Sequence, residues 1–264
     1  EARKCPQVRL YASKVSEHHR DRDRRSWRDS LRYTEAEWSS ADMMVMVTNN
    51  SSGRVHYLAG RYESSRLLGH LYSPDGWRRP YPWLPYALDN GAYGAWVNGR
   101  PFDEAAFMGL CDRAAASEQP PLWVVVPDAV GDRDTTLRQW DSWAPRLTRA
   151  YGWTLALAVQ DGMTAADVPA EAGVVFVGGT TQWKRRTIHE WCAGRRAHVG
   201  RINTERWLWY CWRAGAESCD GTGWFRGCVA QLAGLENYLA RAADGRGPDP
   251  RIESRDLFGY AYGK

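Results

Sequence analysis

The sequence predicts a single-domain (β/α)8 barrel, and two observations support this fold class. Short apolar runs bounded by turn residues, a pattern typical of buried strands, recur along the 264 residues of the chain. Amphipathic stretches with helical spacing separate several of these runs, so that strand and helix alternate about eight times. A doubly wound open sheet is the main alternative. No Gly-x-Gly-x-x-Gly motif follows an early strand, which argues against a dinucleotide-binding version of that sheet.

The expected strands are spread over the whole chain. They are Val8–Ala12, Met44–Thr48, Pro85–Asp89, Leu122–Pro127, Thr154–Val159, Val174–Gly178, Ala197–Gly200 and Glu217–Asp220. Between the first two lies the segment Ser16–Ala41, which is long, polar and partly helical. We interpret this segment as an insertion or a lid over the mouth of the barrel.

Helices are expected where apolar residues recur at helical spacing between the strands. In Asp103–Ser117 these residues include Phe107 and Leu110. Asp132 and Asp134 stand at the start of another such stretch, where an aspartate side chain can cap the helix. The expected helices are Asp103–Ser117, Thr135–Tyr151, Gln182–Cys192, Thr204–Arg213 and a final one at Arg226–Ala243.

The composition is that of an ordinary globular protein. Hydrophobic residues make up 44% of the chain and charged residues 25%. No apolar stretch approaches the roughly 18 residues that a membrane span needs, and no signal-peptide segment lies near the start. Because no repeat or linker divides the chain, we expect one domain over residues 1–264. Six scattered cysteines do not form a disulfide framework, so a reducing cytoplasm is the expected setting.

The net charge of +4 is too small to indicate a nucleic-acid partner by itself. Basic residues gather in short clusters, each of which either contacts phosphate or forms a solvated face. These clusters are Arg20–Arg25, Gly76–Arg79, Lys184–Arg186 and Arg195–Arg196. Most of the fifteen tryptophans are expected to pack in the core, and only a few to contact a ligand.

Three of the apolar runs end in an aspartate followed by small turn residues, at Asp89, Asp128 and Asp220. In a barrel the carboxyl ends of the strands converge on one face, which would bring these side chains together with Gln160 and Arg201. Clustered carboxylates raise one another's pKa, so that one keeps its proton while another is ionised. Such a pair supplies a general acid and a nucleophile for cleavage at the anomeric carbon of a sugar. The competing interpretation is that each aspartate forms a turn or caps a helix.

Several short motifs also occur in order at the spacing of a barrel. They are Asp89-Asn-Gly-Ala-Tyr93, Pro127-Asp128, Ala158-Val-Gln160-Asp-Gly162, Val177-Gly178-Gly179 and Ala216-Glu-Ser-Cys-Asp220. Together they resemble the tRNA-guanine transglycosylase superfamily. The segments Phe176–Lys184 and His198–Asn203 make the chain more similar to its DpdA-type branch, which is associated with placing 7-deazaguanines in phage or bacterial DNA. The resemblance covers residues 55–228.

The resemblance implies roles for the carboxylates. Asp220 matches the nucleophile of the family, which attacks C1′ of the ribose and holds a covalent glycosyl intermediate. Asp89 matches the aspartate beside the base and the leaving group, an acid/base. Asp128 and Gln160 match residues that hydrogen-bond the edge of the guanine or deazaguanine.

Further positions are expected to bind the substrate. They are Asn90, Gly91, Tyr93, Gly178, Gly179, Arg201 and Asn203. Gly178 and Gly179 match a backbone stretch that lies against the heterocycle. For Tyr93, stacking on the base and packing in the core are equal alternatives. Arg201 and Asn203 are hypothesised to contact the sugar or a phosphate.

The chain departs from the tRNA enzymes after the nucleophile. Those enzymes carry a zinc site of Cys-x-Cys-x-x-Cys and a histidine, whereas here only Cys228 follows Asp220, and Cys211 and Cys219 precede it. We therefore expect no metal site, and the chemistry requires no cofactor. The missing subdomain also helps the tRNA enzymes to dimerise and to bind tRNA. Its absence favours DNA as the substrate and leaves the oligomeric state open.

The expected function is exchange of guanine in a polynucleotide, DNA before tRNA, for a free 7-deazapurine base, without a membrane partner and in a bacterial or phage-infected bacterial cell. One alternative is base exchange or N-glycosidic hydrolysis on free nucleosides or nucleotides. Another is a non-catalytic barrel that binds nucleic acid. Carboxylates at both Asp89 and Asp220 argue against the last, because negative charge hinders plain phosphate binding.

Overall fold

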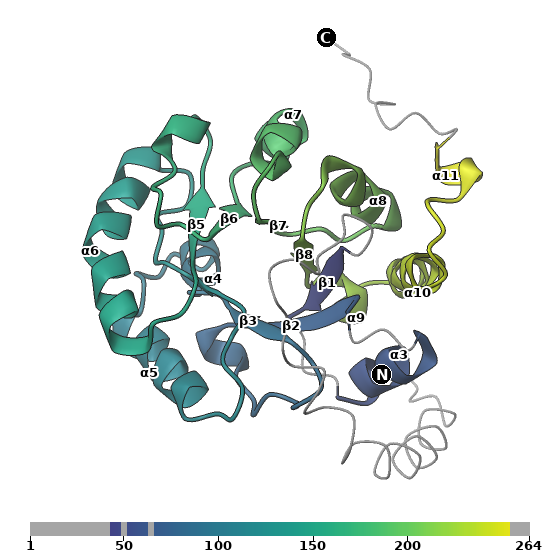
Figure 1. Cartoon of the computed structure of the whole chain (residues 1–264), viewed down its shortest axis with the longest axis horizontal. Helices are drawn as coiled ribbons and strands as arrows, with labels where there is room; N and C mark the ends of the chain where they lie inside the picture. The colour runs from purple at the N-terminus through teal and green to yellow at the C-terminus, as the bar shows by residue number, and fades with distance from the viewer. Residues whose placement is uncertain (1–42, 49–51, 63–65, 254–264) are drawn as a thin grey trace.

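The computed structural model describes residues 43–48, 52–62 and 66–253. Within them eight parallel strands close into one barrel in the order of the chain, which confirms the TIM-like (β/α)8 fold class (Figure 1). The strands are β1 (Met44–Val47), β2 (Leu68–Tyr72), β3 (Tyr86–Leu88), β4 (Val124–Val125), β5 (Leu155–Val159), β6 (Val174–Val177), β7 (Ala197–Val199) and β8 (Ser218–Gly221). The expected strand Val8–Ala12 and the expected insertion Ser16–Ala41 lie outside the described residues.

Strand β2 is absent from the sequence prediction, and the strand expected second is β1 of the barrel. The sequence of β2 interrupts an apolar run with Gly69 and His70. A Cβ at Gly69 would lie 3.0 Å from the backbone carbonyl oxygen of Pro85 and 2.7 Å from Sδ of Met44 on β1, so this position favours glycine. His70 is buried, and its Nδ1 lies 2.6 Å from the hydroxyl of Tyr72. Tertiary contacts therefore select two residues that weaken the local strand pattern.

Helices surround the barrel, and α3, α5, α6, α7, α8 and α10 form its outer ring in Figure 1. The helices are α3 (Ser52–Tyr62), α4 (Ala92–Val97), α5 (Glu104–Ala115), α6 (Arg133–Tyr151), α7 (Thr181–Cys192), α8 (Glu205–Ala214), α9 (Gly223–Arg226), α10 (Val229–Ala243) and α11 (Pro250–Glu253). Asp132 caps α6 as expected, because its Oδ1 accepts the N–H of Thr135 at 3.0 Å. Asp134 lies instead in the first turn of that helix. No helix within the described residues is long and apolar enough to cross a membrane.

The final expected helix, Arg226–Ala243, is divided into α9 and α10. A Cβ at Gly227 would lie 2.5 Å from the backbone carbonyl oxygen of Gly223 and 1.6 Å from Oε1 of Gln231, so this position favours glycine. The same Oε1 accepts the N–H of Cys228 at 3.1 Å. The side chain of Gln231 thus closes the start of α10 and separates it from α9.

Two connections of the barrel lack a full helix in the described residues. The chain from β2 to β3 holds the 3₁₀ turn η2 (Pro74–Gly76), and the chain from β5 to β6 holds η3 (Ala165–Asp167). After η2, the indole of Trp77 packs on the outward-facing rings of Tyr72 and Tyr86, with ring centroids 5.2 and 6.1 Å away. An aromatic loop therefore covers a part of the barrel that a helix usually covers.

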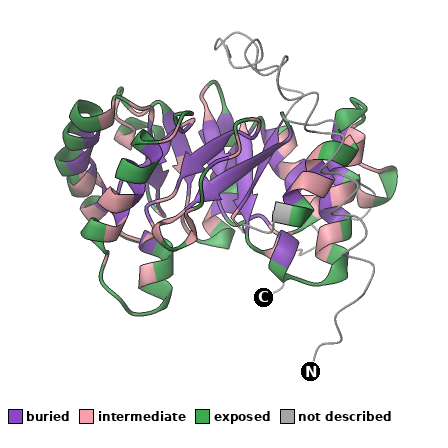
Figure 2. Cartoon of the chain, turned by 90° about the horizontal axis from the view of Figure 1, so that it is seen from below, coloured by how far each residue is buried: buried purple, intermediate pink, exposed green. Residues whose placement is uncertain are grey.

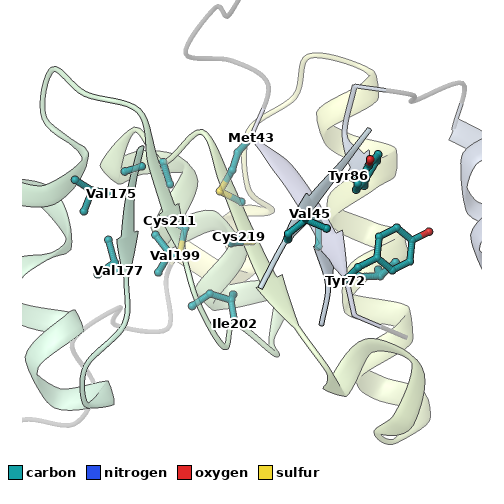
Figure 3. Close-up of a cluster of buried hydrophobic side chains, with 14 of the residues drawn as sticks. Met43, Val45, Tyr72, Tyr86, Val175, Val177, Val199, Ile202, Cys211 and Cys219 are labelled. Carbon is teal, nitrogen blue, oxygen red and sulfur yellow. The ribbon is translucent and has the colours of Figure 1, made fainter. Parts of the chain in front are cut away.

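The apolar core has two layers, because successive side chains of a strand point to opposite faces. The inward-facing layer consists of Met44, Met46, Leu71, Ala87, Trp123, Val125, Ala156, Ala158 and Val174. The outward-facing layer, which includes Val45, Tyr86, Val177 and Cys219, packs beneath the helices (Figure 3). Figure 2 shows the buried strands between helices that expose their outer surfaces.

Candidate active site

The inward-facing layer becomes polar at the carboxyl ends of the strands. Asp89 and Gln160 each stand two residues after an inward-facing alanine, Ala87 on β3 and Ala158 on β5. Asp220 follows Cys219, an outward-facing residue of β8, so the alternation of the strand turns Asp220 inward. The negative charges of Asp220 and Asp128 both act on Asp89, so the three aspartates predicted from the sequence share one site. The fold thus forms the carboxylate cluster that the strand-end pattern predicts.

Asp220 is buried, with 6% of its surface exposed. Its Oδ1 accepts the backbone N–H of Arg201 at 3.2 Å and lies 3.1 Å from Nε2 of His198. No hydrogen-bond donor within the described part of the chain reaches Oδ2. One oxygen of this carboxylate is therefore held in place, and the other is left for a ligand.

His198 is a further member of the candidate site that the sequence reasoning missed. The side chain is fully buried, and its Nδ1 lies 2.8 Å from Oγ of Ser218. The rings of Phe176 and Trp123 flank the imidazole, with centroids 4.8 and 4.9 Å away. His198 on β7 is paired with Ser218 on β8. Asp220 lies two residues further along β8 and so points to the same face as Ser218, where its Oδ1 meets Nε2 of His198. That alternation, His-x-Gly beside Ser-x-Asp, is the signal that could have indicated the contact.

Asp89 is half-buried, and its surroundings favour the protonated form. Burial raises the pKa of Asp89 to about 7, and the charges of Asp220 and Asp128 add to this effect. The backbone N–H groups of Gly91 and Asn90 oppose it in part. Gly91 has a φ of 82°, and a Cβ there would lie 3.1 Å from Pro74, so the turn after Asp89 requires glycine. Asp89 can therefore give or take a proton near neutral pH.

Asp128 is held by two side-chain amides. Nδ2 of Asn90 donates to its Oδ1 at 2.8 Å, and Nε2 of Gln160 donates to its Oδ2 at 2.7 Å. Burial raises the pKa of Asp128 to about 6, and the bond from Asn90 works against this rise. The carboxyl group is thus fixed in orientation and keeps acceptor capacity on both oxygens.

The amides that hold Asp128 are themselves buried and fixed. Asn90 and Gln160 are each 2% exposed. Oδ1 of Asn90 accepts the N–H of Ala92 at 2.7 Å, and Oε1 of Gln160 accepts the N–H of Gly131 at 3.0 Å. In this structure Gln160 positions Asp128, and direct contact of Gln160 with a base stays a prediction.

The two glycines after β6 are needed for close packing. A Cβ at Gly178 would lie 3.0 Å from the carbonyl oxygen of Val159 and 3.3 Å from Nε2 of Gln160. Gly179 has a φ of 63°, and a Cβ there would lie 2.5 Å from the indole of Trp183. The atoms that lie close to these two glycines are therefore protein atoms. Contact of the glycines with a heterocycle stays a prediction.

Arg201 links three parts of the site. Its backbone N–H contacts Asp220, its guanidinium donates to the carbonyl of Gly179, and its Cζ lies 4.6 Å from the ring centroid of Tyr93. Its φ of 63° is the only positive value at a described residue other than glycine. Tyr93 is 41% exposed, so the core-packing interpretation of this residue is wrong.

Asn203 stabilises the turn that follows β8. Its Oδ1 accepts the N–H of Gly223 at 2.6 Å, and its backbone carbonyl accepts Nε2 of Gln231 at 3.0 Å. A Cβ at Gly221 would lie 1.9 Å from the carbonyl oxygen of Ile202, so the chain after Asp220 is tightly constrained. Asn203 thus supports the position of Asp220 in this structure, and its contact with a sugar or phosphate stays a prediction.

Lys184 departs from the sequence interpretation of its basic cluster. It is 3% exposed, whereas both interpretations of the cluster placed it at the surface, and its Nζ donates to the carbonyl of Gly200. Burial lowers the pKa of Lys184 to about 8, helped by Arg201 and opposed by the charge of Asp220. The ammonium group of Lys184 therefore acts as a counter-charge to Asp220.

Within the described residues, no group of three or more histidines, cysteines and carboxylates is arranged to hold a metal ion. Cys211 and Cys219 are buried free thiols, and Cys228 is exposed.

Comparison of the sequence with known protein families finds no family that matches it. Comparison with curated proteins also finds no match. The chemistry of the site must therefore be inferred from its own residues.

Proposed function

We propose that this protein is a base-exchange transglycosylase that replaces guanine in a polynucleotide, specifically DNA, with a 7-deazaguanine. The observation that carries the proposal is the pair formed by Asp220 and Asp89. Asp220 has one oxygen without a partner in the described chain, and Asp89 has a pKa raised to about 7 beside it. A nucleophile next to a proton donor is what glycosyl transfer through a covalent intermediate requires. The ordered motifs that resemble the transglycosylase superfamily support the same chemistry.

In the first half-reaction Oδ2 of Asp220 attacks C1′ of the sugar as the bond from C1′ to guanine breaks. The electron pair of that bond goes to the base, which takes the proton of Asp89 and leaves as neutral guanine. In the second half-reaction Asp89 removes a proton from the ring nitrogen of the incoming 7-deazaguanine. That nitrogen attacks C1′, and the carboxylate of Asp220 is released. The sequence is balanced in protons and electrons and returns both side chains to their starting state.

Asp128 suits recognition of the base. Its two oxygens are held by Asn90 and Gln160 and retain lone pairs, so they can accept the ring N–H and exocyclic N–H groups of guanine. Adenine presents an acceptor where guanine presents its ring N–H. An anchored carboxylate would therefore favour guanine and 7-deazaguanine over adenine.

The test is incubation of the protein with DNA that carries radiolabelled guanine, with and without a 7-deazaguanine. Release of guanine that depends on the added base, and a denaturation-resistant adduct between protein and DNA, would support the proposal. Asp220→Asn should abolish the adduct, whereas Asp141→Asn, an exposed substitution on α6, should leave it unchanged. Folded protein that releases no label from DNA or tRNA would refute the proposal. Exchange on free deoxyguanosine in preference to DNA would assign the activity to nucleosides.

A further inference from the structure

A compact exposed apolar surface lies beside the carboxylates. Within the described residues, the large hydrophobic side chains that are exposed are those of Tyr93, Trp96, Val97 and Val229. The first three belong to α4, which begins three residues after Asp89. Figure 1 shows α4 inside the ring of outer helices, not as a member of it. Of these side chains, Tyr93 and Trp96 lie next to each other, so the exposed apolar surface on α4 is not a single scattered residue.

Trp96 is the centre of this surface. Its side chain is 59% exposed, whereas every other tryptophan in the described ranges is buried or half-buried. The ring of Tyr93 lies 6.0 Å from that of Trp96, with an angle of 34° between the planes. Two neighbouring aromatic rings that are both open to solvent can each stack on a flat ligand.

Cations accompany the aromatic rings. The guanidinium of Arg201 lies over the ring of Tyr93, and the backbone of Arg201 contacts Asp220. Arg100 lies three residues after the end of α4, and its N–H donates to the carbonyl of Ala95 at 2.8 Å. Both arginines are exposed. A ligand on this surface therefore meets aromatic faces and positive charge together, which suits a chain of bases joined by phosphates.

We propose that the α4 surface, made of Tyr93, Trp96, Arg100 and Arg201, binds single-stranded DNA next to the nucleotide held at Asp220. A base adjacent to the target stacks on Trp96, and Arg100 and Arg201 contact the neighbouring phosphates. In a duplex the flanking bases are already stacked and paired, so their faces cannot reach the indole. This inference rests on the proposed function for the identity of the target nucleotide, but binding to the α4 surface can be measured without any reaction.

The experiment measures fluorescence anisotropy of a 5′-labelled single-stranded DNA 12-mer with wild-type protein and variants. Trp96→Ala should raise the Kd about tenfold or more, because stacking of one base on an aromatic ring is lost. Trp96→Phe should recover most of the affinity. Arg100→Gln should reduce the slope of log Kd against log salt by about 0.7, the contribution of one phosphate contact on a single strand.

The matched control is Trp153→Ala, because Trp153 lies at the opposite end of the barrel, just before β5, where it stacks on Tyr151. Its Kd for the 12-mer should equal that of the wild type. Equal binding by Trp96→Ala and wild type would overturn the proposal. So would tighter binding of a duplex than of the single strand, or a dimer in sedimentation that Trp96→Ala dissociates. Loss of binding in Trp96→Ala without any exchange chemistry would leave the DNA site standing and refute the proposed reaction alone.

Discussion

Nε2 of His198 lies 3.1 Å from Oδ1 of Asp220 inside the barrel, while Nδ1 of the same ring lies 2.8 Å from Oγ of Ser218. An ionised carboxylate only accepts hydrogen bonds, so Nε2 carries the hydrogen, and Nδ1 of a neutral ring accepts from the serine hydroxyl. The carboxylate of Asp220 thus selects the tautomer of His198, and the hydroxyl of Ser218 accommodates it by donating to Nδ1. These contacts direct Oδ1 into the protein and leave Oδ2 without a hydrogen-bond donor among the described residues.

We expect His198→Ala to slow formation of the covalent adduct by about 10²-fold, because Asp220 loses the contact that orients it. His198→Gln should lose less, since an amide can still donate to Oδ1. The rate of adduct formation with excess DNA is the measurement. Equal rates for His198→Ala and wild type would contradict a positioning role for the histidine.

The raised pKa of Asp89 predicts the pH dependence of the reaction. If Asp89 gives its proton to the departing guanine, the rate of guanine release should decline as the pH rises above about 7. Asp89→Asn should lower the rate by about 10²–10⁴-fold and remove this decline. Single-turnover release of labelled guanine over the pH range tests both expectations. A decline that persists in Asp89→Asn would assign the proton to another group.

The same carboxyl groups should make stability depend on pH. The pKa values of Asp89 and Asp128, raised to about 7 and about 6, mean that the folded protein holds protons that an unfolded chain releases near pH 4. Proton binding to these two carboxyl groups stabilises the folded state fully below about pH 4. This stabilisation is lost as the pH rises through 6 and 7. We expect the free energy of unfolding to fall by about 2–4 kcal/mol between about pH 5 and about pH 8.

Urea unfolding of the wild type and of Asp89→Asn at both pH values measures this effect. The variant should show a flatter dependence and greater stability than the wild type at the higher pH. Asp141→Asn is the matched control, because Asp141 is exposed on α6, and it should keep the slope of the wild type. A wild-type protein that gains stability between the two pH values would contradict the burial argument.

The backbone of Arg201 predicts a difference between two truncations. Its φ of 63° lies in the left-handed region, which disfavours any residue with a Cβ. Arg201→Gly and Arg201→Ala remove the same guanidinium, but only glycine relieves the strain. Arg201→Gly should therefore be more stable than Arg201→Ala by about 1 kcal/mol in urea unfolding. Equal stabilities would indicate that this turn relaxes when the side chain is removed.

The parts of the fold that local pattern controls could be predicted from the sequence. The run Leu155–Val159 is apolar throughout, and Asp132 stands where a helix cap is needed, so β5 and the start of α6 were expected. β2 could not be found in this way. A Cβ at Gly69 would crowd the carbonyl oxygen of Pro85 and the side chain of Met44, and the buried His70 is paired with Tyr72. Both reasons lie in neighbouring positions of the barrel and not in the periodicity of the strand.

The candidate site shows the same division. The strand-end positions of Asp89, Asp128 and Asp220 were visible in the sequence. The burial of Lys184 was not, because the side chain turns inward on α7 only where its Nζ can reach the carbonyl of Gly200. Nor could the sequence place His198 against Asp220, since that contact depends on the register of β7 with β8.

By itself the sequence determined the fold class, most of its strands and helices, and the carboxylates at the strand ends. These depend on periodicity and turn chemistry over a few neighbouring residues. Only the tertiary structure decided which side chains meet. Closure of β1 on β8 and the register between strands set the distances among Asp89, Asp220 and His198. Burial within that closed barrel then set the proton affinity of Asp89, because desolvation arises only once the surrounding chain has excluded water.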